Sequence, residues 1–142
     1  MRIAVIADIH GNLPALEAVL LDLSKRGVDH IVDLGDCASG PLWPAETMEL
    51  LGELGALTVC GNHDRAVATL DPEVMGPSDR FAFEALDAAS RTRLGDLPPT
   101  LEVIPGIVAC HGTPDDYQTY LLDEVEAGRL VQARREIVER RL

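Results

Sequence analysis

The stretch IAVIADIH, residues 3–10, indicates the fold of this chain more directly than any other segment. Its first five residues are apolar, as in a strand that is buried on both faces of a parallel sheet. Two polar residues, Asp8 and His10, follow where this strand would end. Ligands of open α/β sheets bind outside the carboxyl ends of the strands, so the stretch predicts both a buried strand and a site at its end.

Outward from this stretch, apolar strands alternate with helices through the first 60 residues. Pro14 and Pro44 suit first helical turns, and Gly27 and Gly55 suit helix ends. The alternation predicts an α/β fold whose parallel sheet has right-handed crossovers. The expected strands are 3–7, 30–34 and 57–60, and the expected helices are 14–23 and 44–54.

The second half of the chain has a weaker pattern. Ser78 is a good N-cap for a helix that runs to about Ser90. Residues 101–104 and 107–110 flank the turn pair Pro105-Gly106 and predict a hairpin. From Leu121 onward the chain is highly charged, and we expect it to be mainly helical.

Length and composition limit the class of protein. The 142 residues fit a single domain, 1–142, and 46% of them are hydrophobic. A net charge of −12 argues against stable binding to nucleic acid. Three cysteines do not form a secreted disulfide framework, and no apolar run approaches the length of a membrane span. We therefore expect a soluble cytoplasmic protein that has no contact with a membrane.

Polar side chains follow each of four expected strands. Asp8 and His10 come after the first and Asp36 after the second, while Asn62 and His63 come after the third. His111 follows the second strand of the hairpin, whose direction the sequence leaves open. If these strand ends share one edge, the side chains converge in space.

The residue types in this set suit a metal centre. Carboxylate, imidazole and carboxamide groups are ligands for Mn, Fe, Zn or similar divalent ions. A carboxylate such as Asp36 can bridge two cations. Two cations roughly 3.5–4 Å apart can ionise a water molecule and hold phosphate oxygens.

The sequence contains four fragments in this order: Asp8-Ile-His10, Gly35-Asp36, Gly61-Asn62-His63-Asp64 and His111-Gly112. Together they resemble the motifs of the calcineurin-like metallophosphoesterase family, in its small bacterial phosphodiesterase branch. The resemblance implies a four-layer α/β/β/α sandwich with parallel or mixed sheets. It also implies hydrolysis of phosphomonoesters or phosphodiesters by a hydroxide that two divalent metals, manganese among them, activate. The substrate would be a small phosphate ester.

The resemblance also implies a role for each residue. Asp8 and His10 would bind one metal, Asn62 and His111 the other, and Asp36 both. His63 would be the catalytic residue, and it would lie with Asn62 beside the phosphate. There it would stabilise negative charge or protonate the leaving oxygen, work for which an ordinary pKa of about 6.5 is suitable.

The sequence departs from the family at one motif. The family has a closing Gly-His-x-His segment that supplies one histidine to each metal, and this sequence contains no such segment. We therefore expect a domain that is C-terminally truncated relative to the family, with an exposed sheet edge through which copies of the chain associate. Two alternatives stay open: a catalytically impaired fragment, and a protein-interaction scaffold of the same fold without activity.

Some of these residues have simpler explanations. Asn62 suits a left-handed turn beside Gly61, and His63 could contact a ligand rather than substrate. Cys60 and Cys110 lie beside expected ligands, but strand alternation directs their side chains to the other face. This favours small buried hydrophobic residues over thiolate ligands. Asp33 is similarly offset, and we assign it no role.

Overall fold

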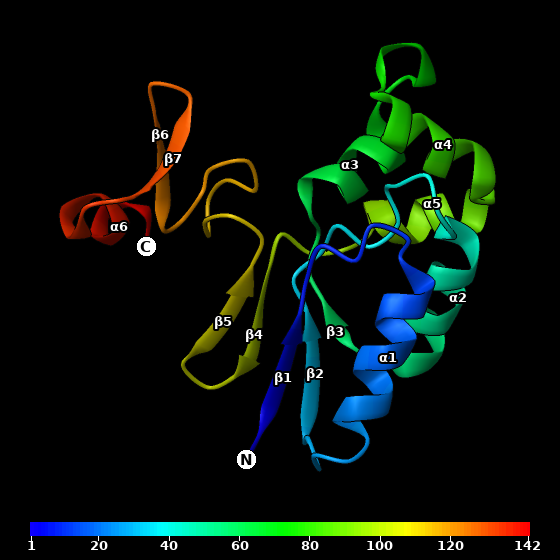
Figure 1. The fold of residues 1–142 in the computed structure, drawn as a ribbon, viewed down its shortest axis with the longest axis horizontal. Helices are drawn as coiled ribbons and strands as arrows, with labels where there is room; N and C mark the ends of the chain where they lie inside the picture. Colours follow the sequence, from blue (N-terminus) through cyan, green and yellow to red (C-terminus); the bar gives the residue numbers. More distant parts are fainter.

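The computed structural model describes all of residues 1–142, and a three-stranded parallel sheet lies at its centre (Figure 1). The strand order is β1-β2-β3, and helices form the two crossovers. This confirms the predicted strand–helix alternation. The elements are β1 (Ile3–Ile6), α1 (Leu13–Leu23), β2 (His30–Asp33), α2 (Pro44–Leu54) and β3 (Leu57–Thr58).

The helix boundaries follow from local chemistry. The Asn12 side chain accepts a hydrogen bond from the Ala15 backbone N–H and caps α1, which has a proline in its first turn. Helix α2 begins at Pro44 and ends at Gly55, whose φ of 64° is the left-handed conformation of a helix C-cap.

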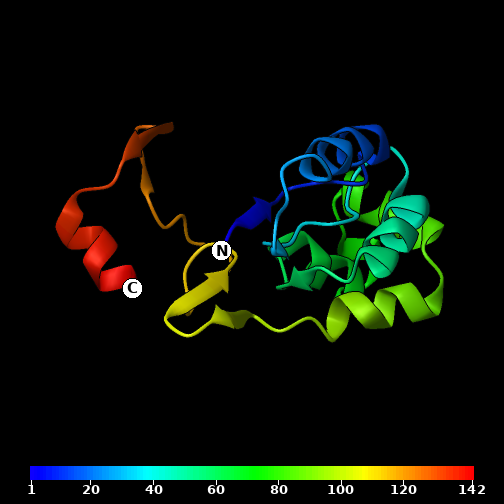
Figure 2. The ribbon, with the colours of Figure 1, turned by 90° about the horizontal axis from the view of Figure 1, so that it is seen from below.

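A hairpin packs on the face of the parallel sheet that the helices leave open (Figure 2). Its strands are β4 (Thr100–Ile104) and β5 (Ile107–Cys110), as predicted. Val32, Val59 and Ala109 form the buried cluster between hairpin and sheet. Helices, parallel sheet and hairpin thus form successive layers of an α/β fold.

The single helix expected from Ser78 to Ser90 is two helices, so that prediction was wrong. They are α4 (Pro77–Ala85) and α5 (Ala88–Gly95), with α3 (Asn62–Thr69) and a 3-10 turn, η1 (Pro72–Val74), before them. Leu86 is extended, and the Asp87 side chain caps α5 by accepting from the Ser90 backbone N–H at 2.7 Å. The break lets Ala82, Leu86 and Leu94 enter one buried cluster.

The prediction of a mainly helical C-terminal segment was also wrong. Strands β6 (Asp123–Glu126) and β7 (Arg129–Gln132) form an antiparallel hairpin that pairs with no other sheet, and only α6 (Arg135–Arg141) is helical. Ala127 and Gly128 have φ of 49° and 76°, which suits a two-residue hairpin turn. Figure 1 shows this unit standing away from the parallel sheet.

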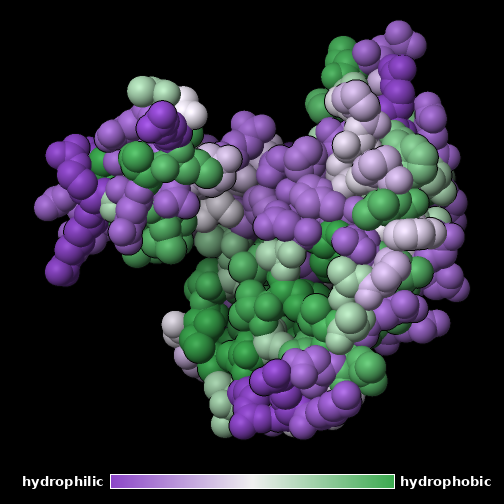
Figure 3. All heavy atoms as spheres, viewed as in Figure 1, coloured by the Kyte–Doolittle hydropathy of each residue, from purple (hydrophilic) through white to green (hydrophobic).

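Between the sheet and the β4–β5 hairpin lies a hollow of about 900 Å³. Figure 3 shows hydrophobic residues lining it. Val5, Ile107 and Val108 are 60%, 46% and 58% exposed there. Its apolar part, here called the apolar trough, consists of Ile3, Val5, Ala7, Val32, Leu34, Val103, Ile107, Val108 and Ala109.

None of the helices combines the length and the apolar character needed to cross a bilayer.

Candidate metal centre

The loops after β1 and β2 run side by side and place the first three predicted ligands. Backbone hydrogen bonds join them, from Asp8 N–H to the Gly35 carbonyl (3.1 Å) and from His10 N–H to the Asp36 carbonyl (2.9 Å). The bonds extend the pairing of the parallel strands beyond the sheet. As a result, the side chains of both loops occupy a common position at the carboxyl ends of the strands.

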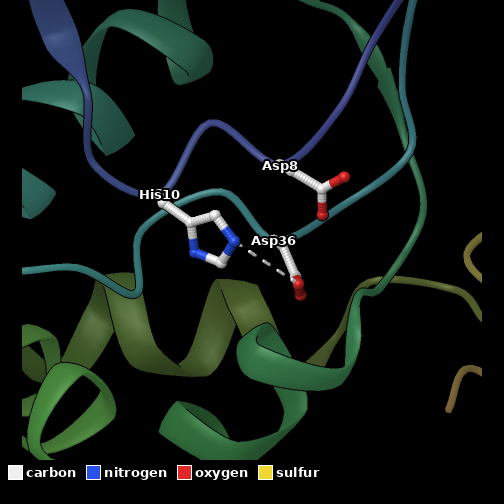
Figure 4. A group of neighbouring side chains, drawn as sticks. All are labelled: Asp8, His10 and Asp36. Atoms are coloured by element: carbon white, nitrogen blue, oxygen red, sulfur yellow. Dashed lines mark ion pairs between the residues drawn. The ribbon is translucent and has the colours of Figure 1, made fainter. Parts of the chain in front are cut away.

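Asp8, His10 and Asp36 converge on one point. One potential ligand atom from each lies within 4.8 Å of the others. Figure 4 shows the three side chains from two neighbouring loops, with His10 directed at Asp36. The distance from His10 Nε2 to Asp36 Oδ2 is 3.9 Å. Three such groups at this spacing are suited to hold a divalent cation.

Asn62 and His111 lie beside the same cluster. His111 Nε2 lies 3.7 Å from Asp36 Oδ2 and 3.0 Å from Asn62 Oδ1. Strand β5 therefore points in the direction that the convergence required. The structure brings together all five side chains predicted to bind metal, and Asp36 lies within 4 Å of both histidines. We call these five residues, Asp8, His10, Asp36, Asn62 and His111, the ligand cluster.

Backbone strain is concentrated in this cluster. Asp8, His10 and Asp36 have φ of 52°, 50° and 57°, in the left-handed region that side chains other than glycine rarely enter. Such a conformation costs about 1–2 kcal/mol per residue. The only other non-glycine residue with a positive φ is Ala127, in the C-terminal hairpin turn. Strain that the surrounding structure maintains at three predicted ligands indicates a functional constraint.

Hydrogen bonds determine which ring nitrogen of each histidine faces the cluster. His10 Nδ1 lies 2.7 Å from the Ser39 carbonyl, and His111 Nδ1 lies 2.8 Å from the Leu34 carbonyl. A carbonyl oxygen only accepts, so each Nδ1 carries the hydrogen and donates it. In a neutral ring Nε2 then presents a lone pair, the arrangement found in histidines that bind metals.

The pair formed by His111 Nε2 and Asn62 Oδ1 supports the same conclusion. With Nδ1 protonated and the ring neutral, both atoms are acceptors, yet they lie 3.0 Å apart. Positive charge near them relieves the repulsion between two lone pairs at this distance. A divalent cation supplies that charge and accepts both atoms as ligands, so the donor set fits a metal.

The geometry agrees with comparisons against known proteins. Residues 1–137 match the model of the family described as calcineurin-like phosphoesterase. The chain belongs to the calcineurin-like phosphoesterase family. A metallophosphoesterase from Sphaerobacter thermophilus is similar in structure, with a TM-score of 0.70 and 34% identity over 87% of this chain and 52% of that one.

Two further relatives are archaeal. A hypothetical protein from Pyrococcus horikoshii has a TM-score of 0.72 and 26% identity over 82% of this chain and 57% of that one. An uncharacterized protein from Methanocaldococcus jannaschii is 51% identical over 65 residues, which are 46% of this chain and 27% of that protein. The chain spans about half the length of these solved structures and about a quarter of this curated relative.

Asp64, which the sequence analysis left without a role, joins two ligand loops of this family member. Its carboxylate is fully buried and accepts backbone hydrogen bonds from Asp36 (2.8 Å), Cys37 (2.9 Å) and Gly61 (3.0 Å). Burial and the nearby charge of Asp36 raise the pKa of Asp64, although the hydrogen bonds oppose this. Its place directly after His63 was the signal in the sequence.

Asp33 also has a structural role, contrary to the sequence analysis. Its side chain is fully buried and accepts from the Gly35 backbone N–H at 3.1 Å. Burial raises the pKa of Asp33 to about 6. The Cys37 thiol lies 3.4 Å from Asp33 and 3.7 Å from Asp64, and burial raises its pKa well above the ordinary value. Cys37 is therefore a neutral core thiol rather than a thiolate ligand.

The other two cysteines also retain neutral thiols. Cys60 is 4% exposed, and burial raises its pKa to about 11. Cys110 is partly buried at the end of β5, and burial raises its pKa as well. Neither belongs to the group of side chains that could hold a metal ion, in keeping with the expectation of small hydrophobic residues.

His63 lies beside the ligand cluster in the first turn of α3. Its ring packs edge-on against His10, with the ring centroids 5.3 Å apart. Burial, the largest single influence, lowers the pKa of His63. The hydrogen bond to Asp79 and the charges of Asp36, Asp79 and Asp64 outweigh it, so the pKa is raised overall. A larger protonated fraction near neutral pH suits a group that stabilises or protonates an oxyanion.

Proposed function

We propose that this chain is a metal-dependent phosphoesterase that uses two divalent cations to hydrolyse small phosphomonoesters or phosphodiesters. Membership of the calcineurin-like phosphoesterase family supports the reaction class. The observation that carries the proposal of two cations is the position of Asp36. Its Oδ2 atom lies near two histidine nitrogens, 3.9 Å from His10 Nε2 and 3.7 Å from His111 Nε2.

This position suggests how the ligands divide. Asp8 and His10 would hold one cation, Asn62 and His111 the other, and Asp36 would bridge them. When bound, such a pair of cations lowers the pKa of a water molecule and polarises phosphate oxygens at neutral pH. Manganese, iron and zinc all suit this set of oxygen and nitrogen ligands.

The chain's own residues would perform the remaining work. His63, half-exposed beside the cluster, would donate a hydrogen bond or a proton to the leaving oxygen. Its backbone N–H donates to Asp36 Oδ1 at 2.9 Å, which holds the bridging carboxylate in orientation. The acidic net charge of −12 favours a small ester over a polynucleotide as substrate.

The test compares the wild-type protein with the Asp36→Asn variant. We expect Mn²⁺ to raise the turnover of bis-p-nitrophenyl phosphate and Asp36→Asn to lower it at least about 100-fold, because the bridging charge is lost. An asparagine oxygen can still accept from the His63 N–H, so the fold is retained, as circular dichroism would verify. Asp115→Asn changes an exposed carboxylate and is the matched control.

Calorimetry with Mn²⁺ separates the alternatives. Metal binding together with turnover supports the proposal. Metal binding without turnover on a panel of phosphate esters would favour the catalytically impaired fragment. Absence of any binding at millimolar Mn²⁺ would reject the metal centre and favour the interaction scaffold.

A further inference from the structure

Asp79 contacts His63 from a part of the chain outside the family motifs. It lies in the first turn of α4, 16 residues after His63, and is 8% exposed. Its Oδ1 atom lies 2.7 Å from His63 Nδ1 and 2.6 Å from Ser39 Oγ. A nearly buried carboxylate that meets the ring of the proposed catalytic histidine has a role beyond helix capping.

The hydrogen-bond roles in this contact follow from the groups themselves. The Ser39 hydroxyl donates to Asp79 Oδ1, and the His63 Nδ1–H donates to the same oxygen. The hydrogen of His63 therefore resides on Nδ1 when the ring is neutral. Asp79 does not line the hollow, whereas His63 does, together with Asp8, Asp36, Asn62 and His111. Nε2 is consequently the ring nitrogen left for substrate.

His63 is the charge partner of Asp79. The carboxylate lies at the N-terminus of α4, where the helix dipole stabilises negative charge. Its ion-pair partner within 4 Å is His63, and no arginine or lysine competes for it. Ser39 comes from the loop after β2, so the contact also joins that loop to α4.

We infer that Asp79 is a positioning residue that holds the His63 ring in one orientation and one tautomer, with Nε2 directed at the leaving oxygen of the substrate. Ser39 supports it by fixing the carboxylate. The inference rests on the proposed function in its catalytic part, while the tautomer can be observed without turnover. The alternative is a structural role alone, in which Asp79 only attaches α4 to the loop after β2.

The decisive variant is Asp79→Leu, which keeps the approximate size of the side chain but has no oxygen to accept the Nδ1–H. The preference for that tautomer should therefore weaken. Long-range ¹H–¹⁵N correlation spectra of the metal-free protein at alkaline pH, where the ring is neutral, report the protonated nitrogen. We expect the Nδ1–H form of His63 in the wild type and a mixture with the Nε2–H form in the variant.

Kinetics provide the second measurement. If the histidine is misoriented, kcat should fall about 10- to 100-fold while KM and the affinity for Mn²⁺ stay within about twofold. Ser39→Ala should give a smaller loss of about two- to fivefold in kcat, because the carboxylate remains. Asp71→Asn, which alters the exposed cap of the neighbouring η1 turn, is the control and should leave both measurements unchanged.

The tautomer spectra and the kinetics can each contradict a different part of the inference. An unchanged Nδ1–H tautomer in Asp79→Leu would overturn the inference, whatever the activity. A common fall in kcat, metal affinity and unfolding free energy would show the merely structural role. Absence of turnover in the wild type would contradict the proposed function instead, and the spectra would still decide whether Asp79 positions the ring.

Discussion

One hollow in this molecule has two ends that are built in opposite ways. At the ligand end, Asp36 and Asp64 are 3% and 0% exposed, and hydrogen bonds to the backbone of other loops hold both. At the other end, the apolar trough leaves Val5 and Val108 more than half exposed. At the ligand end, contacts within the chain hold the buried carboxylates, whereas the trough leaves apolar side chains exposed.

Because of this difference, metal binding and association with other molecules should depend on different parts of the hollow. Positions of ligands depend on contacts inside the chain, so metal binding should be sensitive to small changes in the loops. The apolar trough contributes no ligand, and changes there should affect association with other molecules more than chemistry. The following predictions each change one part of the molecule and measure its stability, metal affinity or self-association.

The largest effect is expected for Gly61→Ala, which disturbs the ligand end. A Cβ atom there would lie 2.1 Å from Asp36 Oδ1 and 2.4 Å from the Asp36 backbone nitrogen. Relief requires one loop to move, which breaks the hydrogen bonds to Asp64. We expect a loss of about 3 kcal/mol in the free energy of unfolding and at least about 100-fold in Mn²⁺ affinity, measured by urea unfolding and calorimetry.

Gly55→Ala is the matched control for this substitution. Gly55 has a φ of +64°, and an added Cβ would meet nothing within 4 Å. It therefore carries the cost of a left-handed conformation, about 1 kcal/mol, without a clash at the cluster. Equal losses of metal affinity in the two variants would show that the loop contact at Gly61 is unimportant.

A smaller effect, dependent on pH, is expected for the buried carboxyl of Asp33. Its pKa in the folded protein is about 6, against an ordinary 3.8. Because the folded state binds this proton more tightly, the stability it contributes is complete below pH 3.8 and is lost as pH rises through 6. The gap corresponds to about 3 kcal/mol at most, since one pH unit is worth about 1.4 kcal/mol.

Asp33→Asn should remove this dependence. The variant is neutral at every pH, so its unfolding free energy should gain on that of the wild type as pH rises through this window and should keep the gain above it. Urea unfolding of both proteins without metal, at several pH values, measures the difference. Asp115→Asn is the exposed control, and a constant difference between Asp33→Asn and wild type at all pH values would contradict the prediction.

These residues also show what sequence can and cannot predict here. Four members of the ligand cluster were predictable because they follow strands of the parallel sheet, which end at one edge. His111 follows a hairpin strand, whose direction the sequence left open. The roles of Asp33 and Asp64 arise from backbone groups of other loops, which leave no periodic signal. Asp79 reaches His63 because α4 packs against α3, an arrangement set by tertiary packing.

The C-terminal segment was predicted wrongly for a different reason. Its glutamates and arginines are good helix formers, and they concealed a two-residue turn at Ala127-Gly128. Cross-strand pairing of Val125 with Leu130 then fixes the hairpin register. Turn geometry outweighed helix propensity, which is a weak guide where a segment has few buried contacts.

The smallest effect is expected at the trough, where we propose that copies of the chain associate. Val108 is 58% exposed on β5, and covering such a side chain contributes about 1–1.5 kcal/mol. Val108→Asp should therefore weaken self-association about tenfold, as sedimentation velocity over a range of concentrations would measure. Mn²⁺ affinity should stay unchanged, because the residue contacts no member of the ligand cluster by hydrogen bond or ion pair.

Val74→Asp provides the matched comparison for the trough. Val74 is 71% exposed in η1 and is not part of the trough, so the same charge is added without touching the proposed contact surface. A selective effect of Val108→Asp would identify the trough as the surface that associates. Equal effects of both substitutions would attribute the change to net charge alone, and a wild type that is monomeric at all concentrations would leave the ligand end as the only functional part of the hollow.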